Sequence, residues 1–548
     1  MKNLSVKMPA LLTLAVSISL MGCTPEEAKK TNDVTESTNR ESYMAQGLVA
    51  KSLPEITQAL TNGEITSEAL VHLYLSRIAD IDTNGPKLQA VLSLNPNALT
   101  DARESDALRQ AGTTLGALHG VPILLKDNIE TQDPVATTAG ALALKDNITG
   151  RDSPLVAGLR SQGAIILGKT NLSQWANFRS NDSMSGWSAL GGQVRNPHML
   201  DRNPCGSSSG SGAATAASLA SASVGTETNG SVICPSNANG IVGFKPTVGL
   251  VPQDYIIPIS ATQDTAGPMT KTVMGAAMMM NAMTPANDVN YRALLSEKAL
   301  KGVRIGVLRF SQGNNSNIIK RFNDALKDMQ AAGAILVDID KSPLEGVSIG
   351  DKAYDLLKYE FKAGLNAYLA STPESVKVRT LEELIAFNQE HAGVELALFD
   401  QSILVESQAM KGLDDPDYIS SRDTVLKANR QDGIDALLSQ YNVDVLVSPS
   451  GPVVPRVDPV NGDVWPSFPG AGGIAARAGY PHASVPMGEI RGLSVNVSFI
   501  GGKTEDAKIL SYAYAYEQKS QKRIEPHYYN GAKDIADIAK AMTHLDRQ

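Results

Sequence analysis

The stretch Pro204-Cys-Gly-Ser207-Ser-Ser-Gly-Ser-Gly212 is dense in glycine and serine and leads into the alanine-rich segment 213–222. This composition predicts a tight loop that enters a helix, where backbone amides and hydroxyl groups can surround a reaction centre. A second glycine-containing turn, Gly225-Thr-Glu-Thr-Asn-Gly230-Ser231, ends in a serine beside several consecutive amides. Taken alone, each segment is more typical of an ordinary turn.

A lysine upstream of these turns changes their interpretation. The segment Gly120-Val-Pro-Ile-Leu-Leu-Lys126-Asp127 places Lys126 at the end of an apolar, strand-like run. Burial disfavours the charged ammonium, so we expect the pKa of Lys126 to fall. A lysine at a strand end is more often a solvated charge. A neutral lysine with two serine hydroxyls would nevertheless suffice for acyl transfer without histidine.

Short apolar runs alternate with helix-like stretches along the whole chain. Such alternation predicts an α/β fold in which helices cover both faces of a largely parallel or mixed sheet. The chain shows no internal repeat or long linker beyond its N-terminal segment, so one large domain is expected. Residues 345–440 look helical and could cover a cleft. The predicted strands are residues 121–125, 164–167, 303–307, 334–337, 443–447 and 493–500.

Composition excludes several function classes. The chain has 49 Lys and Arg against 57 Asp and Glu, for a net charge of −8. A nucleic-acid partner is disfavoured, because phosphate binding needs a basic face. Three cysteines are too few for a disulfide framework, and the seven histidines lie too far apart in sequence for a helical pair of metal ligands. We therefore expect neither a metal ion nor a cofactor.

Two familiar motifs occur in the chain and are misleading. Gly163-Ala-Ile-Ile-Leu-Gly168-Lys169-Thr170 matches the phosphate-binding P-loop pattern, but its intervening residues are apolar and predict a buried strand. Gly206-Ser-Ser-Ser-Gly210 matches the nucleophile elbow of α/β-hydrolases, which would make Ser208 the nucleophile. The preceding residues 201–204 are not strand-like. The elbow also requires a later acid and histidine, and chain order alone does not exclude His391, His482, His527 or His544.

Taken together, the segments around Lys126, Ser207 and Ser231 resemble the amidase signature family and its Ser–cisSer–Lys triad. The resemblance extends along nearly the whole chain beyond the N-terminal segment. Residues 168–178, 243–249, 264–268 and 513–517 look most like the bacterial peptide amidase branch. The resemblance implies a single α/β/α domain around a mixed, twisted sheet covered by helices.

The resemblance also implies roles for individual residues. Ser231 would be the nucleophile, Ser207 a relay preceded by a cis peptide bond, and Lys126 the base. Many relatives have two glycines before the nucleophile, whereas this chain has Asn229-Gly230; asparagine tolerates left-handed backbone angles, so an amide-presenting turn remains feasible. The backbone N–H groups expected to form an oxyanion hole are those of Thr228, Asn229, Gly230 and Ser231.

Four further residues lie close to these segments in sequence. Trp175 and Ala176 are placed where relatives line the substrate cleft, so they are expected substrate contacts, with a purely core role for Trp175 as an equal alternative. Cys205 and Cys234 flank the two serines. We expect both cysteines to be small packing residues, with a disulfide or redox control of the site as the alternative.

These observations predict an amidase that hydrolyses a carboxamide to a carboxylate and ammonia through an acyl-enzyme. The expected substrate is a small-molecule or peptide amide, most naturally the C-terminal amide of a peptide. Other small or aryl amides are the alternative within this class. Outside it, the chain could be a non-catalytic peptide-binding lipoprotein, although Lys126, Ser207 and Ser231 are all present.

The N-terminus looks like a targeting segment. Lys2 and Lys7 precede an apolar stretch at 8–20, and Leu20-Met21-Gly22-Cys23 resembles a bacterial lipobox. We expect residues 1–22 to be a lipoprotein signal peptide, residues 23–44 a polar tether and residues 45–545 the catalytic domain. The chain would then be exported and bound to a membrane only through a lipid on Cys23. An ordinary cleaved signal peptide is the alternative.

Overall fold

The computed structural model describes residues 40, 42–284 and 288–543. The predicted signal peptide (1–22), the lipidation site Cys23 and the tether up to residue 39 lie outside the described residues. The site discussed below belongs to one compact unit that begins at Tyr43. Within the described residues, no helix combines the length and the apolarity needed to cross a bilayer.

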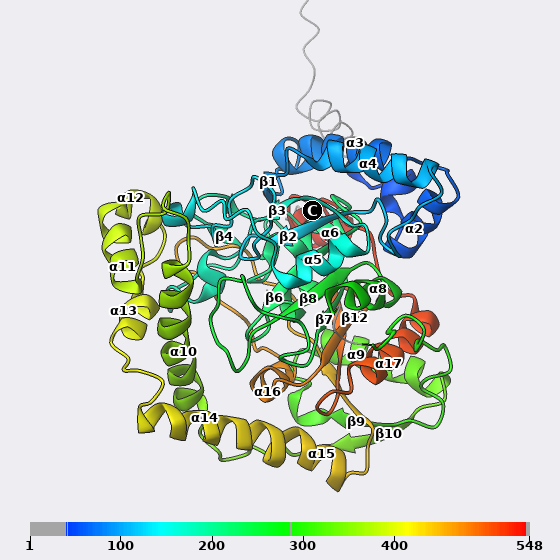
Figure 1. Ribbon diagram of the computed structural model, residues 1–548. Coiled ribbons are helices and arrows are strands. Elements are labelled where there is room, and N and C mark those ends of the chain that lie inside the picture. Colours follow the sequence, from blue (N-terminus) through cyan, green and yellow to red (C-terminus); the bar gives the residue numbers. More distant parts are fainter. Residues whose placement is uncertain (1–39, 41, 285–287, 544–548) are drawn as a thin grey trace, which may run out of the picture. The chain divides into compact units, whose positions relative to one another are not determined.

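One eleven-stranded sheet forms the framework of the compact unit (Figure 1). A separate two-stranded ribbon consists of β4 (Trp187–Ser188) and β5 (Gly192–Gln193). The large sheet runs in the order β1 (Val91–Leu94), β3 (Ile165–Thr170), β2 (Pro122–Lys126), β6 (Ala222–Glu227), β8 (Thr265–Thr270), β7 (Val242–Lys245), β12 (His482–Ile490), β13 (Leu493–Ile500), β11 (Val445–Pro449), β9 (Arg304–Leu308) and β10 (Ile335–Ile339).

The large sheet is mixed. Strands β3, β2 and β6 are parallel neighbours near one edge, and β11, β9 and β10 are parallel neighbours at the other. The strands between these groups pair antiparallel. All six predicted strands are present, as β2, β3, β9, β10, β11 and β13. The predicted α/β fold with a mixed sheet is therefore confirmed.

Helices flank this sheet, and the largest hydrophobic cluster lies between the two. Their bounds are α2 (Leu53–Thr61), α3 (Ser67–Arg77), α4 (Ala98–Gln110), α5 (Pro154–Ser161), α6 (Ser209–Ala216), α7 (Ile233–Asn239), α8 (Val273–Met283), α9 (Ser316–Ala331), α10 (Gly350–Ala370), α11 (Leu381–Glu390), α12 (Ala392–Glu395), α13 (Ser402–Gln408), α14 (Pro416–Asn429), α15 (Asp435–Gln440), α16 (Gly472–Ala478), α17 (Asp506–Ser520) and α18 (Ala536–Met542). The expected helical character of residues 345–440 is confirmed by α10 to α15.

Strand β3 and helix α6 are two elements whose local structure the sequence predicts. The P-loop match is strand β3, and Lys169 within it is fully buried, so the interpretation as a strand is confirmed. The alanine-rich helix predicted over 213–222 instead spans 209–216. It ends early because Ser218 takes a left-handed backbone angle (φ +61°), which turns the chain into β6.

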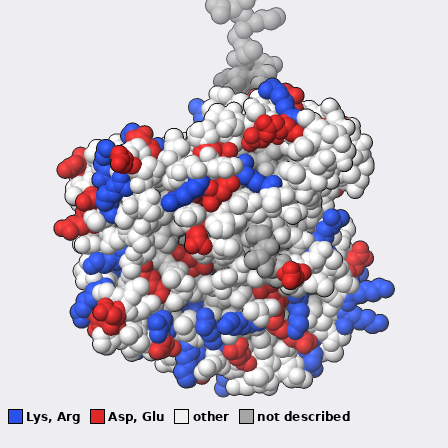
Figure 2. All heavy atoms as spheres, viewed as in Figure 1, with Lys and Arg blue, Asp and Glu red and all other residues white. Residues whose placement is uncertain are grey.

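Charged side chains are mixed by sign on the surface. On the face shown in Figure 2, Lys and Arg alternate with Asp and Glu rather than gathering into one region. That face therefore offers neighbouring charges of both signs to a ligand, and gives no long-range preference for an anionic or a cationic one.

Substitution of Gly210 tests how closely α6 packs against the backbone of the segments beside it. The Gly210 amide donates to the carbonyl oxygen of Asn171 at 2.9 Å, and an added Cβ would overlap the backbone oxygens of Ala90 and Asn171. We expect Gly210→Ala to lower the free energy of unfolding by about 3 kcal/mol, because backbone atoms cannot move aside as a flexible side chain can. Thermal unfolding measures the change. Gly393→Ala is the matched control, since no atom lies within 4 Å of its added Cβ; an equal effect of both variants would contradict this account.

Candidate active site

The parallel pairing of β2 with β6 brings the predicted site residues to one edge of the sheet. The register aligns Ile123 with Ala222 and Leu125 with Val224. Both strands therefore end at the same edge, where open α/β sheets commonly bind ligands. Lys126 is the last residue of β2, and the turn containing Ser231 follows directly after β6.

Lys126 is fully buried and all of its hydrogen-bond acceptors are uncharged. Its Nζ donates to Ser207 Oγ at 2.8 Å, to Thr226 Oγ1 at 2.8 Å and to the Thr226 carbonyl oxygen at 3.2 Å. Burial lowers the pKa of Lys126 to about 7, against the opposing attraction of Asp264 and Glu227. The fall in pKa expected from the sequence is present, and a large fraction of this lysine is neutral near pH 7.

Ser207 lies in the segment that connects Lys126 to the turn carrying Ser231. The peptide bond between Gly206 and Ser207 is cis, as expected, and the Ser207 side chain is completely buried. The next amide, Ser208 N, donates to the carbonyl oxygen of Ser231 at 3.1 Å. Hydrogen bonds therefore connect all three predicted segments. Lys126 donates to the Ser207 hydroxyl, and the amide of Ser208 donates to the carbonyl oxygen of Ser231.

The turn that carries Ser231 is fixed at both ends by carboxylates. Glu227 Oε2 accepts the amides of Val232 at 2.8 Å and Ile233 at 3.0 Å, which are at the start of α7. Thr228 Oγ1 donates to Asp264 Oδ1 at 2.6 Å. The left-handed angle falls on Gly230 (φ +86°) rather than on Asn229, so the Asn229-Gly230 pair does not prevent this turn.

Sequence reasoning missed three residues that shape this turn and surround the lysine. Thr226 and Glu227 lie inside the quoted Gly225–Ser231 segment, where only the glycines and the serine attracted attention. Asp264 begins the segment 264–268, which carried the resemblance without a role. Burial raises the pKa of Asp264 to about 6, against hydrogen bonds from Thr228 and two backbone amides that lower it.

Comparisons with known proteins agree with this geometry. The family model described as Amidase matches residues 69–510. The chain belongs to the amidase signature family. The native peptide amidase of Stenotrophomonas maltophilia is 45% identical, and the match covers 87% of this chain and 98% of that one with a TM-score of 0.83. A probable amidase of Arabidopsis thaliana is 34% identical over 87% of this chain and 91% of its own length.

A third relative supports the same assignment. An amidase family protein from Bacillus anthracis is 32% identical, covering 92% of this chain and 95% of that one with a TM-score of 0.78. The chain is therefore an amide-hydrolysing enzyme. Among the residues that the structure describes, no three His, Cys, Asp or Glu side chains are grouped so that they could hold a metal ion.

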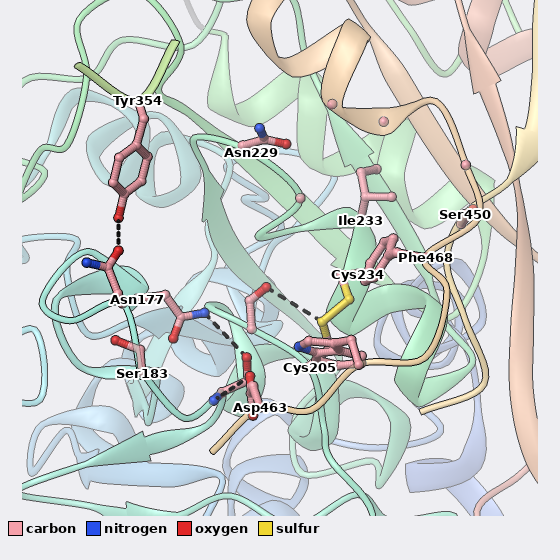
Figure 3. A pocket seen from close by; sticks show the side chains of 18 of the residues that line it. Asn177, Ser183, Cys205, Asn229, Ile233, Cys234, Tyr354, Ser450, Asp463 and Phe468 are labelled. Atoms are coloured by element: carbon pink, nitrogen blue, oxygen red, sulfur yellow. Dashed lines mark hydrogen bonds between the residues drawn. A yellow bond between two sulfur atoms is a disulfide. The ribbon is translucent and has the colours of Figure 1, made fainter. Parts of the chain in front are cut away.

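A cavity of about 480 Å³ opens beside the edge of the sheet that carries Lys126 (Figure 3). Asn229 and Gly230 of the turn that leads to Ser231, and Gly206 of the serine loop (residues 204–208), line it. Tyr354 from α10 and Ile403 from α13 form one wall, which agrees with the expectation that the helical region covers a cleft. The opposite wall comes from residues 450–470 and the first two residues of α16, and includes Asp463, Trp465 and Phe468.

The two cysteines beside the serines form a disulfide, Cys205–Cys234, with their Cα atoms 5.8 Å apart. The expectation that they are independent packing residues is therefore wrong, and the alternative that the sequence left open is correct. The sulfurs meet because α7 packs on α6 and Asn239 of α7 donates a hydrogen bond to the Pro204 carbonyl of the serine loop. Both residues are almost fully buried, yet both contribute to the lining of the cavity.

Trp175 and Ala176 do not line the cavity of this amidase. Trp175 is 2% exposed and belongs to a hydrophobic cluster with Phe178, Phe361 and Leu365, and Ala176 packs against the same cluster. The core interpretation of Trp175 is the one that the packing supports. Ser208 does not behave as an elbow nucleophile, since its Oγ is buried and donates to the Thr226 carbonyl oxygen at 3.0 Å.

Proposed function

We propose that this amidase hydrolyses the C-terminal amides of peptides, with Ser231 as nucleophile, Ser207 as relay and Lys126 as base. The observation that carries the proposal is the 2.8 Å hydrogen bond between Lys126 Nζ and Ser207 Oγ, in a buried position next to the Ser231 turn. A neutral amine within hydrogen-bond distance of a hydroxyl meets the geometric requirement for a general base.

The proposed reaction begins with proton transfer from Ser231 through Ser207 to Lys126. Neutral Lys126 takes the proton of Ser207 while Ser207 takes that of Ser231, and Ser231 Oγ attacks the amide carbon. Lys126 becomes an ammonium and the carbonyl oxygen becomes an oxyanion. The protons then return through Ser207 to the amide nitrogen, which leaves as ammonia. Water hydrolyses the resulting ester by the same relay and regenerates Ser231.

The oxyanion would be stabilised by the backbone amides of residues 228–231. Their turn is held by Glu227 and Asp264 before substrate arrives, so the donors need little reorganisation. The loss of one such donor typically slows a reaction by an amount equivalent to about 3 kcal/mol. The left-handed angle at Gly230 supports a turn in which several amides face one side.

The peptide substrate is supported by relatives and by the shape of the cavity. A peptide amidase structure that is also 45% identical to this chain is a complex with the competitive inhibitor chymostatin. The cavity has room for more than a primary amide, and its lining combines polar groups with the aromatic side chains of Tyr354, Trp465 and Phe468. A bacterial aryl acylamidase is only 22% identical to this chain, so it supports the fold and not an aryl amide substrate.

The role of Ser231 is tested by replacing it. We expect Ser231→Ala to reduce ammonia release from amidated dipeptides by at least roughly 1,000-fold, because no other hydroxyl would attack the carbonyl. An enzymatic ammonia assay measures the rate. Ser439→Ala, an exposed serine on α15, is the control and is expected to retain the parent rate. An unchanged rate in Ser231→Ala would reject the assignment.

The protonation state of Lys126 predicts a pH dependence. Only the neutral amine accepts a proton, so kcat/KM should fall about tenfold per pH unit below an apparent pKa of about 7 and level off above it. Asp264→Asn removes a negative charge that raises the pKa of Lys126, so the acidic limb of the profile should move to lower pH. A profile of kcat/KM from pH 5 to pH 9 checks both points. A shift to higher pH in Asp264→Asn would contradict this electrostatic account.

We also propose that residues 1–22 direct export and that Cys23 carries the lipid anchor. The basic start, the apolar stretch and the Leu20–Cys23 pattern support this, and a disulfide is typical of an oxidising compartment. In a bacterial host, we expect the parent chain to incorporate labelled palmitate and to sediment with membranes, and Cys23→Ser to do neither. Labelling that persists in Cys23→Ser would rule out Cys23 as the attachment site.

A further inference from the structure

The Cys205–Cys234 disulfide joins the two segments that carry the proposed relay and nucleophile. Cys205 precedes Ser207 with only Gly206 between them. Cys234 follows Ser231 in the first turn of α7. A covalent link therefore spans the interface across which Ser207 and Ser231 must exchange a proton (Figure 3).

Each end of this link is held firmly by its own segment. On the relay side, Cys205 N donates to Asn203 Oδ1 at 2.8 Å and the Cys205 carbonyl accepts Ser209 Oγ at 2.6 Å. On the nucleophile side, Cys234 N donates to the Gly230 carbonyl at 2.7 Å. A displacement of either sulfur is therefore transmitted to the adjacent serine instead of being absorbed by a flexible loop.

Hydrogen bonds also connect the two segments directly. Ser208 N donates to the Ser231 carbonyl at 3.1 Å, and Asn239 Nδ2 donates to the Pro204 carbonyl at 3.0 Å. Ser208 Oγ donates to the Thr226 carbonyl at 3.0 Å and accepts from Thr226 N at 3.2 Å. None of these four bonds uses the side chain of Ser207 or Ser231. The surrounding helices α6 and α7 pack on each other and on strands of the sheet, so the fold itself has much other support.

We propose that the Cys205–Cys234 disulfide is a positioning element of the active site, which sets Ser207 against Ser231 so that full turnover requires the oxidised pair. The inference rests on the proposed function. Proton transfer between hydroxyls needs heavy atoms within about 3.2 Å of each other. A displacement of about 1 Å in such a relay slows a reaction by roughly 100-fold, so a crosslink at this place acts on rate more than on binding.

The test compares the oxidised and reduced forms of the same folded chain. Both cysteines are almost fully buried but line the cavity, so a small water-soluble phosphine is the reductant; one phosphine and one water convert the disulfide to two thiols and a phosphine oxide. We expect reduction to lower kcat for an amidated dipeptide at least tenfold, with KM changed less than twofold. Circular dichroism at the assay temperature should remain native, and reoxidation should restore kcat.

Cysteine variants provide the matched controls. The double variant Cys205→Ala/Cys234→Ala should have the low kcat of the reduced parent and should not respond to the phosphine. Cys23→Ser keeps the disulfide and should respond as the parent does. If the double variant does not fold, reduction of the folded parent decides the question alone.

The outcomes separate this inference from the proposed function. Equal kcat in the oxidised and reduced chains would overturn the positioning role and leave the amidase assignment standing. A loss of kcat that follows the loss of the circular dichroism signal would also overturn it, because the disulfide would then support folding only. Absence of ammonia release from the oxidised chain would instead reject the peptide amidase function itself.

Discussion

The burial of the Lys126 amine among uncharged acceptors is the constraint on which the active site depends. An ammonium removed from water is destabilised unless a counterion compensates, so the pKa of this lysine falls far enough for it to be a base near neutral pH. Lys169 on the adjacent strand β3 is equally buried, and burial lowers its pKa as well, against the opposing attraction of Asp127 at 3.7 Å from its Nζ. The register pairs Lys169 with Leu125 and Lys126 with Thr170, so the two lysines lie on opposite faces of the sheet. Among the described residues, Lys126 differs from Lys169 in having no carboxylate within ion-pair distance.

The sheet topology explains how residues from only three segments come together at the site. Because β2 and β6 are parallel neighbours, the residue that ends one strand and the turn that follows the other meet without a long connection. The serine loop reaches the same edge because α6 runs from it toward β6, and Gly210 lets this helix approach the backbone of residues 90 and 171. The sheet positions the proposed base and the turn of the proposed nucleophile, and the helix positions the proposed relay.

The parts of this arrangement that local composition controls could be predicted from the sequence. Apolar runs predicted six strands, and the three glycine- or lysine-containing segments identified the residues that now lie together. Features that depend on contacts between residues distant in sequence could not be predicted from local composition. The pairing of Cys205 with Cys234 requires α7 to pack against the serine loop, and the burial of Trp175 requires the helices of residues 350–408. The premature end of α6 depends on one backbone angle at Ser218, which alanine propensity does not reveal.

The carboxylates around the turn have a further consequence in the proposed mechanism. Asp264 and Glu227 favour the charged form of Lys126, but burial outweighs them and lowers its pKa to about 7, so a large fraction of the proposed base is neutral at rest. Lys126 gains its positive charge only as Ser231 attacks, and at that moment both carboxylates attract it. Their attraction is therefore greater in the transition state than in the ground state, which is the condition for an interaction to increase rate rather than binding. The same two residues fix the turn: Asp264 accepts the hydroxyl of Thr228, and Glu227 accepts the amides of Val232 and Ile233 that follow it. One pair of acidic side chains can thus both shape the oxyanion site and stabilise the charge that develops on the base.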